Sequence, residues 1–246
     1  MADPQAWWRR VELARFLDAA LIRRVPRDHT ESDAAFRRRR LVSLVTAVCG
    51  AVLLWLSFRI EPGDRRFYLT TFALALVWTL GAFASGPLHL GWAFTRKGQR
   101  LARPVVQSLA LGVLAVAVFS AGALIVARLP LLRDSLNAVL DHARFGSLPV
   151  VAVITLVNGV AEELFFRGAL FAAIGRRHPV AISTACYALT TVFSLNLMLV
   201  FAAAVLGVLV GLQRRVTGGV LGPMITHVTW SLSMLLILPP LITALT

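Results

Sequence analysis

Seven long stretches of mostly apolar residues dominate the chain and constrain its fold more than any other feature. A helix needs about 20 such residues to cross a bilayer. Apolar residues make up 58% of the 246 residues and charged residues 15%, whereas soluble domains average roughly 45–50% and 25%. We therefore predict an all-α, polytopic membrane helical bundle of about seven transmembrane helices. The predicted spans are 41–58, 67–94, 105–127, 148–174, 180–195, 197–212 and 219–238.

Two features of the sequence affect the predicted ends and number of the spans. Pro239 and Pro240 are expected to end the last span, since proline interrupts a helix interior. The segment 180–212 also fits a single re-entrant unit in place of two spans.

Arginine and lysine are distributed unevenly between the predicted loops. Counted over alternate loops, one side carries 18 basic residues and the other 6. Basic residues accumulate in cytoplasmic loops, so we expect a multi-pass protein of the cell (cytoplasmic) membrane with its N-terminus in the cytoplasm. The excess positive charge flanks apolar spans, which indicates the lipid bilayer as the partner of these residues and argues against nucleic acid.

The chain divides into three regions by composition. Residues 1–40 are predicted to form a cytoplasmic, basic, amphipathic region, with apolar residues at helical spacing among arginines. Residues 41–147 hold the N-terminal transmembrane helices and an outer interfacial helix at 129–145. Residues 148–246 hold the remaining predicted spans and, as the family resemblance described below implies, a catalytic-type core. The apolar positions of the first region are Trp7, Val11, Ala14, Leu17 and Leu21.

Ionisable residues are scarce inside the predicted spans and are functional candidates by default. The fourth span carries Glu162, Glu163 and Arg167, and the seventh carries His227. Glu163 and Arg167 are four residues apart, so they lie on one helical face and can pair. Glu162 is rotated about 100° away, which leaves it free to act as a general base. The alternative is a buried ion cluster that serves packing or ion transport.

The depths of the polar groups in the membrane predict a shared site. At about 1.5 Å per residue, Glu162, Thr191 and His227 fall within about 6 Å of each other in depth. We therefore expect them to line one cavity, opening toward the cytoplasm. Ser231 lies four residues after His227 and shares its helical face.

Several motifs in this order resemble the CPBP family of intramembrane proteases. They are Glu162-Glu163-x-x-x-Arg167-Gly168, a helix containing Ser183, and the run Gly207…Thr217-Gly218-Gly219…Pro223…His227. The family includes CAAX prenyl endopeptidases and bacteriocin-processing proteins, and the resemblance covers about residues 148–238. It implies an intramembrane endopeptidase of the glutamic type (formerly grouped with metallopeptidases) acting on a protein or peptide at the membrane. Glu162, Glu163, Arg167 and His227 are its implied catalytic residues.

The resemblance implies that Glu162 activates a water with the help of a histidine on the next span, while His227 and an asparagine four residues later orient the water or stabilise the oxyanion. This chain departs from the pattern twice. Thr191 stands where the second motif has histidine, after Tyr187 in place of phenylalanine, and Ser231 stands where the last motif has asparagine. Hydroxyl groups can hydrogen-bond a water or an oxyanion but do not take up a proton near neutral pH.

Two readings of the function therefore stay open. One is an intramembrane endopeptidase, and the other is a catalytically impaired or inactive member that acts as a membrane binding or scaffold protein. No cofactor is expected. A metal is weakly supported, because one histidine and one free glutamate fall short of the three protein ligands usual for catalytic zinc.

Overall fold

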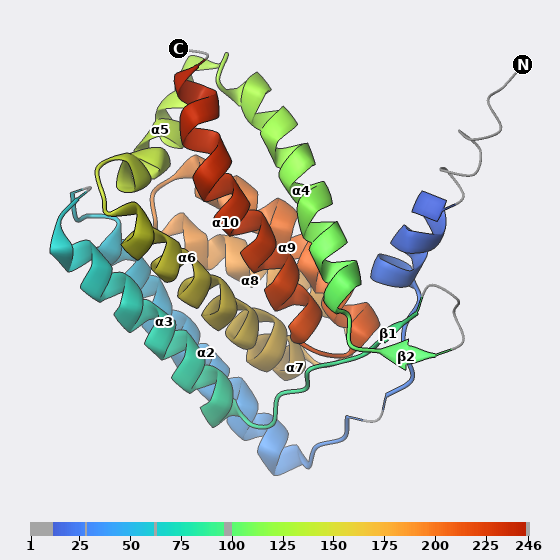
Figure 1. The fold of residues 1–246 in the computed structure, drawn as a ribbon. Coiled ribbons are helices and arrows are strands. Elements are labelled where there is room, and N and C mark those ends of the chain that lie inside the picture. Colours follow the sequence, from blue (N-terminus) through green and yellow to red (C-terminus); the bar gives the residue numbers. More distant parts are fainter. Residues whose placement is uncertain (1–11, 28, 62, 96–99, 245–246) are drawn as a thin grey trace, which may run out of the picture.

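The computed structural model describes residues 12–27, 29–61, 63–95 and 100–244 and consists almost entirely of helices (Figure 1). Residues 12–17 are helical and lead into the short π-helix η1 (Asp18–Ile22). A two-stranded antiparallel hairpin, β1 (Ala93–Phe94) and β2 (Leu101–Ala102), lies between α3 and α4. The remaining elements are α2 (Asp33–Ser57), α3 (Arg65–Ser85), α4 (Val105–Val126), α5 (Pro130–Arg144), α6 (Leu148–Glu162), η2 (Glu163–Leu170), α7 (Phe171–Ile174), α8 (Pro179–Val192), α9 (Leu197–Thr217) and α10 (Leu221–Thr243).

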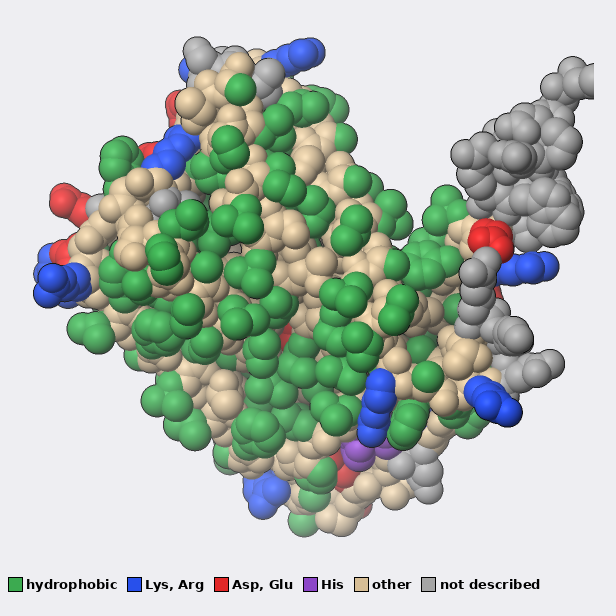
Figure 2. Space-filling model, in the orientation of Figure 1, with side chains coloured by type: hydrophobic (Ala, Val, Ile, Leu, Met, Phe, Trp, Pro, Cys, Tyr) green, Lys and Arg blue, Asp and Glu red, His purple; other side chains and the backbone are tan. Residues whose placement is uncertain are grey.

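The described part of the chain has six helices long and apolar enough to cross a membrane, which confirms an all-α, multi-pass membrane protein. The predicted span 148–174 is continuous through α6, η2 and α7. The predicted fifth span corresponds to α8, whose 14 residues reach about 21 Å at 1.5 Å per residue. This is short of the roughly 30 Å hydrocarbon core. In Figure 2, hydrophobic side chains cover the middle of the molecule and charged side chains gather toward its ends.

The helix ends meet at two opposite ends of the bundle. At one end, which we call the arginine-rich end, backbone hydrogen bonds join Val25 to Val216 and Trp92 to Thr217. At the opposite end, the backbone N–H of Ser147 donates to the hydroxyl of Tyr68. Successive loops between the spans therefore lie at alternate ends of the bundle, as the count of basic residues on the two sides assumed. The arginine-rich end comprises residues 23–27, 29–32, 86–95, 100–104, 175–178 and 218–220. The opposite end comprises residues 58–61, 63–64, 127–147, 193–196 and the end of α10.

Small residues let neighbouring helices approach closely. A Cβ added to Gly50 of α2 would lie 1.9 Å from the Trp78 ring of α3. A Cβ at Gly207 of α9 would lie 3.0 Å from Thr184 of α8. Gly211 faces α8 in the same way, so the small-residue stripe of α9 is a helix-packing surface.

The N-terminal boundary of the bundle differs from the prediction. Helix α2 begins at Asp33, capped by the Ser32 hydroxyl, so it includes arginines that composition assigned to the region before the membrane. One of them, Arg39, is 1% exposed and is paired with Glu31. It also donates to the Ser85 hydroxyl and the Pro87 carbonyl at the end of α3. Trp7 and Val11 of the predicted amphipathic helix lie outside the described residues.

The C-terminal end also differs, because α10 continues through Pro239 and Pro240 to Thr243. The Thr243 hydroxyl donates to the Pro239 carbonyl, and the amide of Ala244 donates to the Pro240 carbonyl. The helical geometry is thus kept beyond the prolines. The predicted outer helix is α5, which packs Leu136 and Leu140 against α4 and α10.

Candidate active site

The carboxylates of the fourth span lie where an α-helix gives way to a π-helix. Helix α6 ends at Glu162, and η2 begins at Glu163. Such wide turns inside α-helices occur frequently at functional sites. The carbonyl oxygen of Arg167, inside the wide turn, accepts a 2.6 Å hydrogen bond from Nε of Arg214 in α9. The π-helix is therefore held from outside by the last turn of a neighbouring helix.

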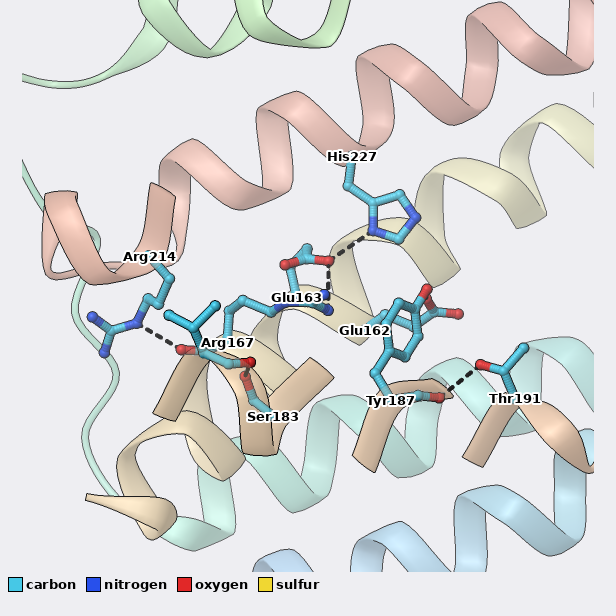
Figure 3. A network of polar contacts seen from close by, with 9 residues as sticks. Glu162, Glu163, Arg167, Ser183, Tyr187, Thr191, Arg214 and His227 are labelled. Carbon is cyan, nitrogen blue, oxygen red and sulfur yellow. Dashed lines mark hydrogen bonds and ion pairs between the residues drawn. The ribbon is translucent and has the colours of Figure 1, made fainter. Parts of the chain in front are cut away.

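Glu163 is the centre of a buried ion cluster (Figure 3). Its Oε1 lies 3.0 Å from Nη1 of Arg167 and 2.8 Å from Nδ1 of His227. Glu163 and Arg167 are fully buried, and His227 is 5% exposed. The pair four residues apart was predicted from the spacing, whereas the contact between Glu163 and His227 was not. The histidine is thus oriented by the second glutamate of the motif.

Glu162 points away from this cluster and toward α8 (Figure 3). Its Oε2 accepts a 2.5 Å hydrogen bond from the hydroxyl of Tyr187. The Tyr187 ring also lies 4.7 Å from the guanidinium carbon of Arg167, an arrangement that favours a cation–π contact. Sequence reasoning missed Tyr187 as a site residue. The available signal was its place four residues before Thr191, at the position where the family motif has phenylalanine.

A cavity of about 190 Å³ brings Glu162, Thr191 and His227 together, as their predicted depths require. The rest of its lining is mostly apolar and aromatic, including Phe166 and Trp230. The lining continues through the last turns of α2 and α8 and the first turns of α9, at Leu54, Phe58, Thr190, Leu199 and Ala202. It therefore extends toward the opposite end of the bundle, not toward the arginine-rich end as the sequence had suggested.

The two residues that replace family residues take different positions. Thr191 lines the cavity, but its hydroxyl donates to the backbone carbonyl of Tyr187 at 2.8 Å. Ser231 is absent from the cavity lining, and its hydroxyl bonds to the Val228 carbonyl at 3.4 Å. The Ser231 hydroxyl oxygen would lie 3.8 Å from a Cβ added to Gly159 of α6. Ser231 therefore sits at a helix–helix contact in this structure.

Some polar atoms of the cluster have no hydrogen-bond partner among the described residues. They are Oε2 of Glu163 and both Nε and Nη2 of Arg167, all buried. Among the residues that the structure describes, no three His, Cys, Asp or Glu side chains are grouped so that they could hold a metal ion. The buried cluster therefore combines the carboxylate of Glu163, the guanidinium of Arg167 and the imidazole of His227. The carboxylate of Glu162 lies outside this cluster and faces the cavity.

The fold and these residues define a class: polytopic helical membrane proteins with a glutamate and a histidine facing one internal cavity. Residues 144–233, a little over a third of the chain, match the family model described as type II CAAX prenyl endopeptidase Rce1-like. The matched segment contains every candidate site residue. Over this segment the chain is similar to the CPBP family of intramembrane proteases, to which the CAAX prenyl endopeptidases belong. Comparison with curated proteins and with solved structures gave no match.

Proposed function

We propose that the protein is an intramembrane endopeptidase that hydrolyses a peptide bond of a membrane-associated protein or peptide with water activated by Glu162. The observation that carries the proposal is the shared cavity, which is lined by both Glu162 and His227. A carboxylate can take a proton from water within hydrogen-bond reach. The apolar lining suits an extended or lipid-modified peptide.

His227 is the second working group in this proposal. Glu163 is an acceptor because it is paired with Arg167, so Nδ1 of the neutral imidazole carries the proton that it donates to Glu163. The other ring nitrogen, Nε2, then has a lone pair that can orient the attacking water. The proton that Glu162 takes from the water can pass to Nε2, which then donates a hydrogen bond to the oxyanion of the tetrahedral intermediate and afterwards gives the proton to the leaving amine. Glu163 and Arg167 act as positioning residues, since they fix the tautomer and the ring of His227.

Substitution of the proposed base tests this mechanism. Glu162→Gln removes the proton acceptor and keeps the size of the side chain, so cleavage should fall about 10²–10⁴-fold. The termini of membrane proteins are compared by mass spectrometry in cells that carry wild-type protein, Glu162→Gln, or the control Glu61→Gln. Glu61 is an exposed carboxylate in the α2–α3 loop. Unprocessed precursors should accumulate with Glu162→Gln and not with Glu61→Gln, and a chelator should leave cleavage by the purified protein unchanged. Identical termini in all three strains would contradict the proposal.

The second candidate is a catalytically impaired member that holds a membrane peptide in the same cavity without cleaving it. Thr191 favours this candidate, because its hydroxyl is committed to the backbone of its own helix and it replaces the family's proton-transfer histidine. Thr191→His separates the two. Cleavage by the Thr191→His variant would show that the missing imidazole limits an otherwise complete site. Peptide binding without cleavage in both the wild-type protein and Thr191→His would support the non-catalytic candidate.

We also propose that the N-terminus lies in the cytoplasm, with the protein in the cell membrane. The 18 to 6 distribution of basic residues supports this orientation. The cavity then extends toward the outer side of the membrane. Accessibility reporters fused in the 95–100 loop and in the α2–α3 loop should report the cytoplasm and the outside, respectively. The reverse result would invert the orientation.

A further inference from the structure

A second cavity, of about 260 Å³, lies at the arginine-rich end, away from the candidate active site. Three parts of the chain that are distant in sequence form it: residues 25–27 and 29 before α2, residues 88–92 after α3, and the end of α9. Arg103 completes the lining just before α4. Four helices of the bundle end or begin beside it, at Ser85, Val105, Thr217 and Leu221. The cavity, which we call the boundary pocket, is therefore located where the spans leave the membrane.

The lining of the boundary pocket is cationic. It contains Arg27, Arg103, His29 and His89, and none of the described lining residues is acidic. Both arginines donate to backbone carbonyls: Arg27 to that of Arg215 at 2.8 Å and Arg103 to that of Gly91 at 2.8 Å. A guanidinium has five N–H donors, so each has donors left for a ligand. These bonds orient the arginines without neutralising them.

Neighbouring groups determine which residues of the lining carry its positive charge. The rings of His29 and His89 are stacked with their centroids 3.6 Å apart. Burial of His89, together with the cations Arg214 and Arg39, lowers the pKa of this histidine, while Arg39 and Glu31 form an ion pair and largely cancel each other's charge. The lowered pKa favours neutral His89, so the two arginines of the lining carry its positive charge. Figure 2 shows histidine side chains at the surface near the lower end of the molecule.

An apolar surface borders this cationic lining. Leu90 and Trp92 line the pocket and are exposed, and Arg103 lies over the Trp92 ring at 3.9 Å. Val105 and Val106, two residues further along the chain, are exposed at the start of the membrane span α4. A free anion would use the charged part alone. A molecule with an anionic head and an apolar chain matches both parts.

We propose that the boundary pocket binds the phosphate headgroup of an anionic membrane lipid, with Arg27 and Arg103 as the phosphate ligands and the acyl chain along Trp92 and α4. Arginine forks suit phosphate oxygens, since two parallel N–H donors match two oxygens. Because Arg27 belongs to the segment before α2, the lipid also ties that segment to the transmembrane bundle. The site does not depend on the peptidase reaction.

Lipid affinity measured by native mass spectrometry tests the proposal. Purified full-length protein is titrated with phosphatidylglycerol or phosphatidylcholine of identical acyl chains. Each surface arginine contributes about 1 kcal/mol to the binding of anionic lipid, so Arg27→Gln with Arg103→Gln should lower the affinity for phosphatidylglycerol about tenfold or more. Affinity for phosphatidylcholine should not change.

The matched control is Arg59→Gln with Arg128→Gln. Arg59 lies 4.2 Å from the Trp55 ring at the opposite end and reproduces the arginine–tryptophan contact without the pocket, and Arg128 is likewise exposed at that end. This control should keep the wild-type affinity. Should the glutamine variant fold poorly, Arg27→Lys with Arg103→Lys keeps the charges and should bind phosphatidylglycerol more weakly than wild type.

Three results would overturn the proposal. Equal affinity of wild-type protein for the two lipids would remove the headgroup preference. An equal loss in the pocket and control variants would show unspecific charge attraction. Inorganic phosphate that displaces the lipid at similar concentration would identify a site for the free anion.

Discussion

The two sides of the α6–η2 helix hold neighbouring glutamates in opposite circumstances. On one side, Glu163 is buried between Arg167 and His227, and its charge is compensated. On the other side, Glu162 faces a cavity and has a neutral hydroxyl, that of Tyr187, as its partner. A buried, compensated charge serves structure and orientation, whereas a carboxylate beside a cavity is available for chemistry. Adjacent residues of the same type thus acquire separate tasks from a rotation of about 100°.

The largest expected effect comes from breaking the compensated side. Arg167→Met leaves the charge of Glu163 buried without its guanidinium, and removal of one partner from a buried pair costs about 3–5 kcal/mol. The free energy of unfolding in detergent should fall by this amount. Glu163→Gln combined with Arg167→Met should be less destabilised than Arg167→Met alone, since no unpaired charge is left.

Arg66→Met is the control for this prediction. It removes an arginine from an ion pair with Asp64 in which the Arg66 side chain is 77% exposed. Water solvates both partners of such a pair, so little change in stability is expected. If Arg167→Met is no more destabilising than Arg66→Met, the Glu163 cluster does not hold the helix in place.

A smaller effect is expected on the cavity side. Tyr187→Phe removes the hydroxyl that donates to Glu162, while the ring remains to pack on Phe166 at 4.6 Å. A hydrogen bond to a charged group contributes about 1.5–3 kcal/mol, so the cleavage rate should fall about tenfold or more.

Thr191→Val distinguishes the contribution of the Thr191 hydroxyl to cleavage from that of the Tyr187 hydroxyl. The Thr191 hydroxyl donates to a backbone carbonyl, so its loss should lower the cleavage rate less than Tyr187→Phe does. If Thr191→Val lowers the cleavage rate more than Tyr187→Phe does, the hydroxyl that assists cleavage is that of Thr191, and Tyr187 is a packing residue.

Much of the fold follows from apolar run length, which locates the long helices because the bilayer sets their length. The pairing of Glu163 with Arg167 follows from helical spacing. The position of Arg39 does not, since its partners Glu31, Ser85 and Pro87 come from separate segments. The continuation of α10 through Pro239 and Pro240 was missed because local proline chemistry favours a helix end there.

Contacts that depend on helix rotation were the least predictable part of the site. Depth along the span brought Glu162, Thr191 and His227 to one level, but depth says nothing about which atoms meet. The contact between His227 and Glu163, and the one between Tyr187 and Glu162, depend on how α8 and α10 turn toward η2. The π-helical turn itself has no local sequence signal that we can identify.

The wide turn of η2 restricts which changes in chain length this protein can tolerate during evolution. The wide turn holds one residue more than an α-helical turn, so deleting one residue from 164–170 would close it to α-helical geometry and leave the helix after it close to its present orientation. The Arg167 carbonyl would then be paired within the helix, and Nε of Arg214, which now donates to that carbonyl, would lose its acceptor. A descendant chain that retains this site should therefore vary in length in its loops, such as the one before α6, and not within these turns.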